Sequence, residues 1–283
     1  MRRGKPGFDR PRFLWVVTAL TIVFLYVPLA VVFVYSLNNS NSLTAFHGVS
    51  LRWYRTLFAD PAMLGSLWVS LKIAVLATAG SVVLGTMLAL GIHRGPKILG
   101  RPVNAVVFLR IVTPETATGV AMLLMFTQLG IRLSIVTVII SHIAMCVPFV
   151  AVVVYSRLVL LNEEVEESAM DLGATRLGAV WLVAVPTLRP AIIASALLSF
   201  VLSFDDFITS FFTSGIGVPP LPVTIYGMLR EGVTPEVNAV GVLMLVITAA
   251  AIALAALIAR MFSRRTGILL EQAAPELKEV QHA

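Results

Sequence analysis

Residues 133–157 read LSIVTVIISHIAMCVPFVAVVVYSR, and Arg157 at the end of this stretch is its only charged side chain. A helix needs about 20 mostly apolar residues to cross the hydrocarbon core of a bilayer. A strand is disfavoured, because the stretch shows no long alternation of polar and apolar residues and an open strand edge finds no hydrogen-bond partner in lipid. The stretch therefore predicts a transmembrane helix.

Five further stretches of this kind lie along the chain, at residues 13–36, 67–92, 103–128, 191–213 and 239–262. The stretch at 103–128 is the weakest, because Arg110 and Glu115 interrupt it. Together the stretches predict an all-α integral membrane protein with six transmembrane helices. The transmembrane domain then spans residues 13–262, between an N-terminal arm at 1–12 and a C-terminal tail at 263–283.

The composition is that of a membrane protein. Hydrophobic residues make up 58% of the 283 residues and charged residues 13%, with a mean hydropathy of +0.92. A soluble domain has about 45–50% apolar and about 25% charged residues. The formal net charge of +6 does not point to nucleic acid, because the basic residues stand in short segments beside apolar stretches. The single cysteine, Cys146, excludes an intrachain disulfide, and we expect it to be a small buried apolar side chain.

Lys and Arg concentrate in the segments that would share one side of the membrane. These are the N-terminal arm, the connections after the second and fourth predicted helices, and the C-terminal tail. The connections on the other side hold four basic residues, Arg52, Arg55, Arg132 and Arg230. Because basic residues favour the cytoplasmic side, we expect both termini in the cytoplasm. The first apolar stretch is longer than the apolar core of a signal peptide, about 7–15 residues, so we expect a retained helix.

The inner connection at residues 161–190 has strong helical character. It begins LNEEVEESAMDLGA, in which Asn162 is a good N-cap and several glutamates follow in the first turns, where the helix dipole favours acids. Val165, Ala169 and Leu172 form one apolar stripe. Gly173 suits the left-handed residue that ends a helix.

A second short helix is predicted directly after Gly173. Leu177, Val180, Trp181 and Ala184 fall at helical spacing, and we expect Pro186 and Pro190 to mark the return into the membrane. The product is a pair of helices at the cytoplasmic face. These residues alone leave two interpretations open, an ordinary surface helix pair or a docking element for a cytoplasmic partner.

Three acids, Glu115, Asp205 and Asp206, lie inside predicted spans. An ionised acid in hydrocarbon is costly, so it usually faces a cavity or a partner charge. In a structural interpretation Asp205 or Asp206 pairs with Arg110 or Lys72. In a functional one the acids line a polar pathway for a cationic solute. Adjacent residues of a helix point about 100° apart, so Asp205 and Asp206 are not expected to share one role.

Motifs for covalent chemistry are missing from the sequence. It holds no G-x-x-x-x-G-K-[ST] phosphate loop and no G-x-S-x-G turn. The histidines at 47, 93, 142 and 282 are scattered, and His142 within a span is expected to be a hydrogen-bonded structural residue. We therefore predict a protein that is not an enzyme and that binds no metal or other cofactor.

The inner connection resembles the EAA loop of binding-protein-dependent ABC importer permeases. The matching residues are Glu167, Ser168 and Ala169 for Glu-Ala-Ala, then Gly173, and Val183, Val185 and Pro186 for the closing Ile-x-Leu-Pro. The resemblance implies a coupling helix pair between the fourth and fifth helices that docks on an ABC ATPase dimer. Glu167, Ala169, Gly173 and Pro186 would form that contact, with ATP and Mg bound by the ATPase.

Several other stretches resemble the spermidine/putrescine permease subunits of that family. They are residues 198–215 around Asp205-Asp206, residues 221–226 and 232–239, and Pro114-Glu115 with Gly119. The resemblance implies a permease subunit that moves a polyamine across a bacterial inner membrane. Its partners would be a second permease and a periplasmic solute-binding protein, and Glu115, Asp205 and Asp206 would line the substrate pathway. The alternative is a self-sufficient secondary transporter or channel for a small cationic solute, against which the EAA-like loop argues.

Overall fold

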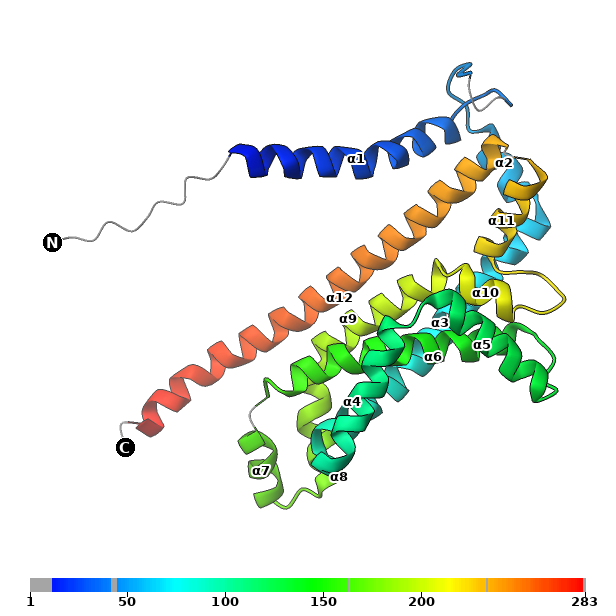
Figure 1. Ribbon diagram of the computed structural model, residues 1–283. Coiled ribbons are helices and arrows are strands. Elements are labelled where there is room, and N and C mark those ends of the chain that lie inside the picture. The colour runs from blue at the N-terminus through cyan, green and yellow to red at the C-terminus, as the bar shows by residue number, and fades with distance from the viewer. Residues whose placement is uncertain (1–11, 42–44, 162, 233, 282–283) are drawn as a thin grey trace. The chain divides into compact units, whose positions relative to one another are not determined.

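The computed structural model describes residues 12–41, 45–161, 163–232 and 234–281, and helices dominate this part of the chain (Figure 1). Most of the N-terminal arm and the predicted cap Asn162 lie outside the described residues. The helices are α1 Arg12–Ser36, α2 Arg52–Ala59, α3 Pro61–Arg94, α4 Lys97–Val112, α5 Glu115–Gln128, α6 Ile135–Leu158, α7 Glu163–Asp171, α8 Arg176–Ala179, a π-helix Val180–Ala184, α9 Val185–Phe204, α10 Ile208–Thr213, α11 Leu221–Glu231 and α12 Pro235–Gln281.

Within the described residues, five helical stretches are long and apolar enough to cross a membrane, and a sixth exists if one bent pair of helices counts as a span. The five are 13–36, 61–94, 135–158, 176–204 and 235–261. This agrees with the predicted all-α membrane fold. The second stretch is longer than predicted, because α3 continues to both sides of residues 67–92.

The predicted third span is bent by 110° between Val112 and Glu115, so residues 103–128 form two helices, α4 and α5, where one was predicted. Pro114 causes the break, because it has no N–H to donate and its ring clashes with the preceding turn. The hydroxyls of Thr113 and Thr118 donate to the carbonyls of Leu109, at 2.6 Å, and of Pro114, at 3.3 Å. Side-chain hydroxyls therefore bond backbone carbonyls on both sides of the bend.

The predicted fifth helix at 191–213 is also interrupted. α9 ends at Phe204, and α10 begins at Ile208, so Asp205 and Asp206 lie in a break rather than within a helix. The predicted second helix after Gly173 is present as α8 and the π-helix, and it continues without a break into α9, so one helical run extends from Arg176 to Phe204. Pro186 has no N–H and so donates no hydrogen bond to the preceding turn. One residue earlier, the N–H of Val185 donates to the carbonyl of Val180, five residues back, which is the bonding pattern of a π-helix. The prolines thus alter the local winding without ending the helix.

The chain divides into two compact units, one of residues up to 61 with 225–245, the other of residues 62–224 with 246 onward. In the first unit, α1 is joined to α2 through its last turn. Ser36 Oγ lies 2.8 Å from the Tyr54 hydroxyl, and the Trp53 indole donates to the Asn38 carbonyl at 2.8 Å. These contacts fix the chain direction where it leaves α1.

The core of the second unit lies where α6 runs beside α9 (Figure 1). A buried apolar cluster joins α3, α6 and α9 and consists of Ala89, Val150, Val154, Leu158 and Leu188. Gly85 of α3 permits close packing, because a Cβ there would lie 2.5 Å from Cβ of Val150. Cys146 is buried, as predicted. This rigid core carries both groups of candidate residues described next.

Candidate functional site

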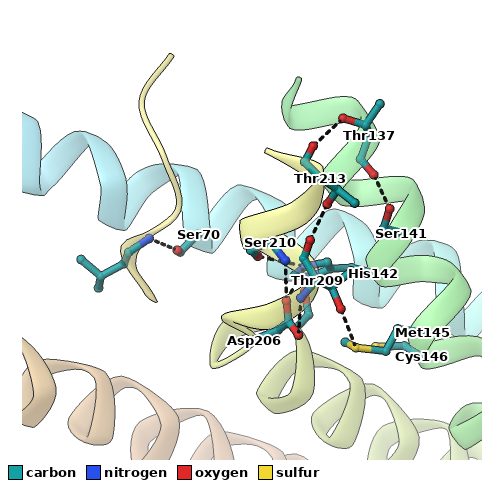
Figure 2. A network of polar contacts seen from close by, with 12 residues as sticks. Ser70, Thr137, Ser141, His142, Met145, Cys146, Asp206, Thr209, Ser210 and Thr213 are labelled. Carbon is teal, nitrogen blue, oxygen red and sulfur yellow. Dashed lines mark hydrogen bonds and ion pairs between the residues drawn. The ribbon is translucent and has the colours of Figure 1, made fainter. Parts of the chain in front are cut away.

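The break between α9 and α10 is held by the carboxylate of Asp206, which is buried (Figure 2). Oδ2 accepts from the N–H of Ser210 at 2.8 Å, and Oδ1 accepts from the N–H of Thr209 at 3.3 Å. The first N–H groups of a helix have no partner within the helix, so an acid at this position caps it. Asp206 therefore stabilises the start of α10.

His142 of α6 is the partner of the Asp206 side chain, in place of the predicted Arg110 or Lys72. Its Nε2 lies 3.2 Å from Oδ2 of Asp206 and 3.1 Å from the hydroxyl of Ser210. Its Nδ1 lies 2.7 Å from the hydroxyl of Ser203 in α9. His142 is thus the hydrogen-bonded structural histidine that the sequence predicts, and it joins three helices.

A second contact joins α6 to α10 further along the same face (Figure 2). The Thr137 hydroxyl donates to the carbonyl of Thr213 at 2.8 Å, and Thr213 is the last residue of α10. The hydroxyls of Ser141 and Thr213 bond carbonyls of their own helices, so they leave no buried donor unpaired. Both ends of α10 are therefore attached to α6.

Asp205 and Glu115 have environments unlike that of Asp206. Asp205 is the residue after α9, and Glu115 is the first residue of α5, and both are exposed. The structure thus separates the two adjacent aspartates, one exposed and one buried. Two guanidinium nitrogens of Arg110, Nε and Nη2, are buried and have no hydrogen-bond partner in the described part of the chain.

The surface helix α7 ends at a glycine in the way the sequence predicts. Gly173 has φ +94°, which favours glycine because it has no Cβ. Its N–H donates to the carbonyl of Met170 at 2.9 Å, and the N–H of Ala174 donates to that of Ala169 at 3.0 Å. This bonding pattern is a Schellman motif. Thr175 then caps α8, since its hydroxyl accepts from the N–H of Gly178 at 3.0 Å.

The apolar side chains around this turn point away from the bundle. Leu172 is 91% exposed and Trp181 is 66% exposed, and Val165 and Leu177 are exposed too. Of the residues that match the EAA pattern, Glu167 and Gly173 are exposed, while Ala169 is half-buried. Pro186 is also half-buried and lies in the first turn of α9 rather than on α7. An exposed apolar patch beside acids is typical of a docking surface.

One ion pair that the sequence did not reveal links α7 to the transmembrane bundle. Nη2 of Arg94, the last residue of α3, lies 2.5 Å from both carboxylate oxygens of Glu166. The pair borders a pocket of about 430 Å³ whose lining includes Leu158, Leu161 and Met170. No spacing rule relates residues 94 and 166, so only the fold brings them together. Within the described residues no group of three or more metal-binding side chains occurs.

These features define a helical membrane protein with broken spans and an exposed surface helix between two of them. The model of the family described as binding-protein-dependent transport system inner membrane component matches residues 81–268. The chain belongs to this family. The match includes α7, Gly173 and both aspartates of the α9–α10 break. The predicted membership of the binding-protein-dependent permeases is thus confirmed, and with it the location in the inner membrane.

Curated relatives match most of the chain. The putrescine transport system permease protein PotI of Escherichia coli strain K12 is 37% identical over 239 residues, which cover 81% of this chain and 84% of that protein. The spermidine/putrescine transport system permease protein PotC of the same strain is 34% identical, with 84% and 90% covered. PotC of Haemophilus influenzae strain Rd is 31% identical, with 89% and 97% covered. The predicted similarity to spermidine/putrescine permease subunits is confirmed.

Solved structures of importers share the fold. A chain of a bacterial ABC transporter involved in the import of the acidic polysaccharide alginate aligns with a TM-score of 0.68 and 18% identity, over 91% of this chain and 96% of that one. A chain of the methionine ABC transporter MetNI, in an inward-facing conformation, gives a TM-score of 0.62 at 20% identity, over 76% and 99%. The likeness confirms the predicted fold class.

Proposed function

We propose that this chain is a permease subunit of an ABC importer that carries a polyamine, such as putrescine or spermidine, across the bacterial inner membrane. The observation that carries the proposal is the exposed helix α7, closed by Gly173, with apolar side chains and Glu167 turned outward. The solute is inferred from the relatives, which are named for putrescine or for spermidine/putrescine. Both termini and α7 would then lie in the cytoplasm, as the distribution of basic residues favours.

The proposed docking surface consists of Glu167, Ala169, Gly173 and Pro186, and its occupant is one ATPase subunit of an ABC dimer. Glu167 supplies charge, while the exposed apolar side chains beside it supply area that burial would stabilise. ATP and Mg²⁺ would be bound by the ATPase, so this chain would catalyse no reaction of its own. A second, similar permease would complete the pathway, and a periplasmic solute-binding protein would deliver the solute.

The proposed substrate pathway includes Glu115, Asp205 and Asp206. Glu115 and Asp205 are exposed, so their carboxylates can approach the ammonium groups of a polyamine directly. Asp206 would act through the position that it gives to Asp205, since its own carboxylate is buried against His142. In this mechanism, closure of the ATPase dimer displaces α7, and the spans alternate between outward-facing and inward-facing states.

The docking surface is tested by the double change Glu167→Lys with Gly173→Asp in the complex isolated from its native membrane. We expect the ATPase to be lost from the purified complex and uptake of labelled putrescine to fall to background. Glu231→Lys, the same charge change at an exposed acid of α11, is the control and should retain both. If the double variant keeps its ATPase and its uptake, the docking proposal is wrong.

The requirement for an ATPase is tested with this chain alone in proteoliposomes. We expect no accumulation of labelled putrescine. Transport by the isolated chain would favour a secondary transporter or channel in place of an ABC permease.

A further inference from the structure

α7 is attached to the bundle in two physically different ways. Its helix-to-helix packing is with α8 and the π-helix, which continue directly into α9. Figure 1 shows α7 and α8 together, beyond the ends of α6 and α9. Through this packing, a displacement of α7 reaches α9. For a displacement of α7 to reach α3 as well, the two helices need a contact of their own.

The space between α7 and the end of α3 is not filled by side chains. The pocket of about 430 Å³ lies there, lined by His93 and Arg94 of α3, Leu158 of α6, and Glu166 and Met170 of α7. Apolar packing is therefore interrupted between α7 and α3. The Arg94–Glu166 ion pair joins the two helices at this pocket, with both Nη2–oxygen distances at 2.5 Å.

The end of α3 that carries Arg94 also contacts α6. α3 is a continuous helix of 34 residues, and Arg94 is its last residue. The ring of His93 meets that of Tyr155 in α6 edge-on, with centroids 6.1 Å apart. Side chains of Arg94 and Glu166 are 30% and 23% exposed, so water and salt screen the pair less than a fully exposed one. A displacement of Glu166 would thus act on the end of one continuous helix of 34 residues.

We propose that Arg94 is a positioning residue that couples the movement of α7 to the second span, α3, through its ion pair with Glu166. The inference rests on the proposed function, in which an ATPase moves α7. The displacement then reaches two spans, α9 through the continuous helical run and α3 through the ion pair. Without the pair, the ATPase still docks on α7, but hydrolysis is less well converted into solute movement.

The test measures labelled putrescine taken up per ATP hydrolysed by the complex isolated from its native membrane and placed in proteoliposomes. Arg94→Glu changes no residue of the proposed docking surface, of which Glu167 lines the same pocket, so co-purification of the ATPase is measured alongside the ratio. We expect the ratio to fall about fivefold, because a repulsion between two carboxylates replaces the attraction between Arg94 and Glu166. Glu166→Arg should give a similar fall, and Arg94→Lys, which keeps the charge, a smaller one.

Rescue distinguishes coupling from a general loss of structure. The exchange of both charges, Arg94→Glu with Glu166→Arg, should restore most of the ratio. Arg176→Glu combined with Glu166→Arg is the matched control, because Arg176 lines the same pocket and the structure gives it no ion pair with Glu166. This control should leave the ratio of putrescine taken up to ATP hydrolysed as low as in Glu166→Arg alone.

The outcomes separate this inference from the proposed function. If the ratio is unchanged in Arg94→Glu, or if the charge exchange fails to restore it, the coupling role is wrong while docking on α7 still stands. Loss of the ATPase from Arg94→Glu would mean that the pair shapes the docking surface, which also overturns the coupling role. Failure of the docking surface itself is read separately, from the Glu167→Lys with Gly173→Asp variant.

Discussion

Nε2 of His142 lies 3.2 Å from Oδ2 of Asp206, and these two side chains attach the middle of α6 to the break between α9 and α10. Both are almost fully buried. Removing one partner of a buried pair leaves an uncompensated polar group, whereas the intact pair satisfies both. The contact therefore controls the stability of the region that presents Asp205.

Loss of the His142–Asp206 contact should destabilise the protein strongly. We expect His142→Ala to lower the free energy of unfolding by about 3–5 kcal/mol, because it leaves the Asp206 carboxylate buried with only backbone partners. Thermal denaturation of the purified chain in detergent measures this. Ser156→Ala is the control, because its exposed hydroxyl bonds only the carbonyl of Val152 in its own helix.

A double-mutant cycle refines this prediction. If the two residues stabilise the fold through each other, His142→Ala should cost far less in a chain that already carries Asp206→Ala. Equal costs in the two backgrounds would show that His142 acts through Ser203 and Ser210 alone.

Neutralising the exposed acids should reduce transport without reducing stability. We expect Asp205→Asn to lower uptake of labelled putrescine about tenfold, equivalent to roughly 1.4 kcal/mol, with little change in the melting temperature, because Asp205 is an exposed residue and an amide keeps its size. Glu115→Gln should behave alike. Asp206→Asn should instead lower both quantities, because an amide has one acceptor oxygen and cannot replace the two carboxylate oxygens that bond Thr209, Ser210 and His142. Unchanged uptake in Asp205→Asn and Glu115→Gln together would rule out the acidic pathway.

The membrane orientation is tested with single cysteines in a Cys146→Ala background. Cys146 is the only natural cysteine and is buried, so its replacement leaves no competing thiol. Leu172→Cys, at a side chain that is 91% exposed beside α7, should react with a membrane-impermeant maleimide in inside-out vesicles and not in spheroplasts. Ile216→Cys, at a fully exposed residue between α10 and α11, should show the opposite pattern. A reversed pattern would place α7 outside and exclude docking to a cytoplasmic ATPase.

Local sequence signals predicted some of the helices and their ends. The apolar run at 133–157 closely matches α6, and Gly173 ends α7 in the left-handed conformation that only a residue without a Cβ adopts readily. Such features depend on neighbours in the chain, so a single sequence is enough to find them.

The breaks within spans were harder to predict. A span is recognised from its average apolar character over about 20 residues, and this average does not show where the helix is interrupted. The stretch at 103–128 was predicted to be the weakest because Arg110 and Glu115 interrupt it, but neither these charges nor the missing N–H of Pro114 reveals a bend of 110°. At the second break, two adjacent acids in an apolar run were the available signal, and they were read as helical. The capping of α10 by Asp206 explains why the chain leaves the helix there.

Contacts between distant residues could not be predicted from one sequence. His142 meets Asp206, and Arg94 meets Glu166, across separations that no helical or strand period relates. Charge alone suggested Arg110 as a partner for the aspartates, and in the fold two of its guanidinium nitrogens are buried without a hydrogen bond to any described residue. Which charges meet is decided by the packing of α6 beside α9, and that packing is a property of the whole fold.

The bend between α4 and α5 places the first turn of a helix, rather than its middle, within the predicted third span. The first N–H groups of a helix together act like a positive charge of about half an elementary unit. Glu115 occupies the first position of α5, so the backbone itself supplies a counter-charge to this carboxylate. This interaction with the helix start does not cover the carboxylate oxygens, and because Glu115 is exposed they stay available to an arriving cation.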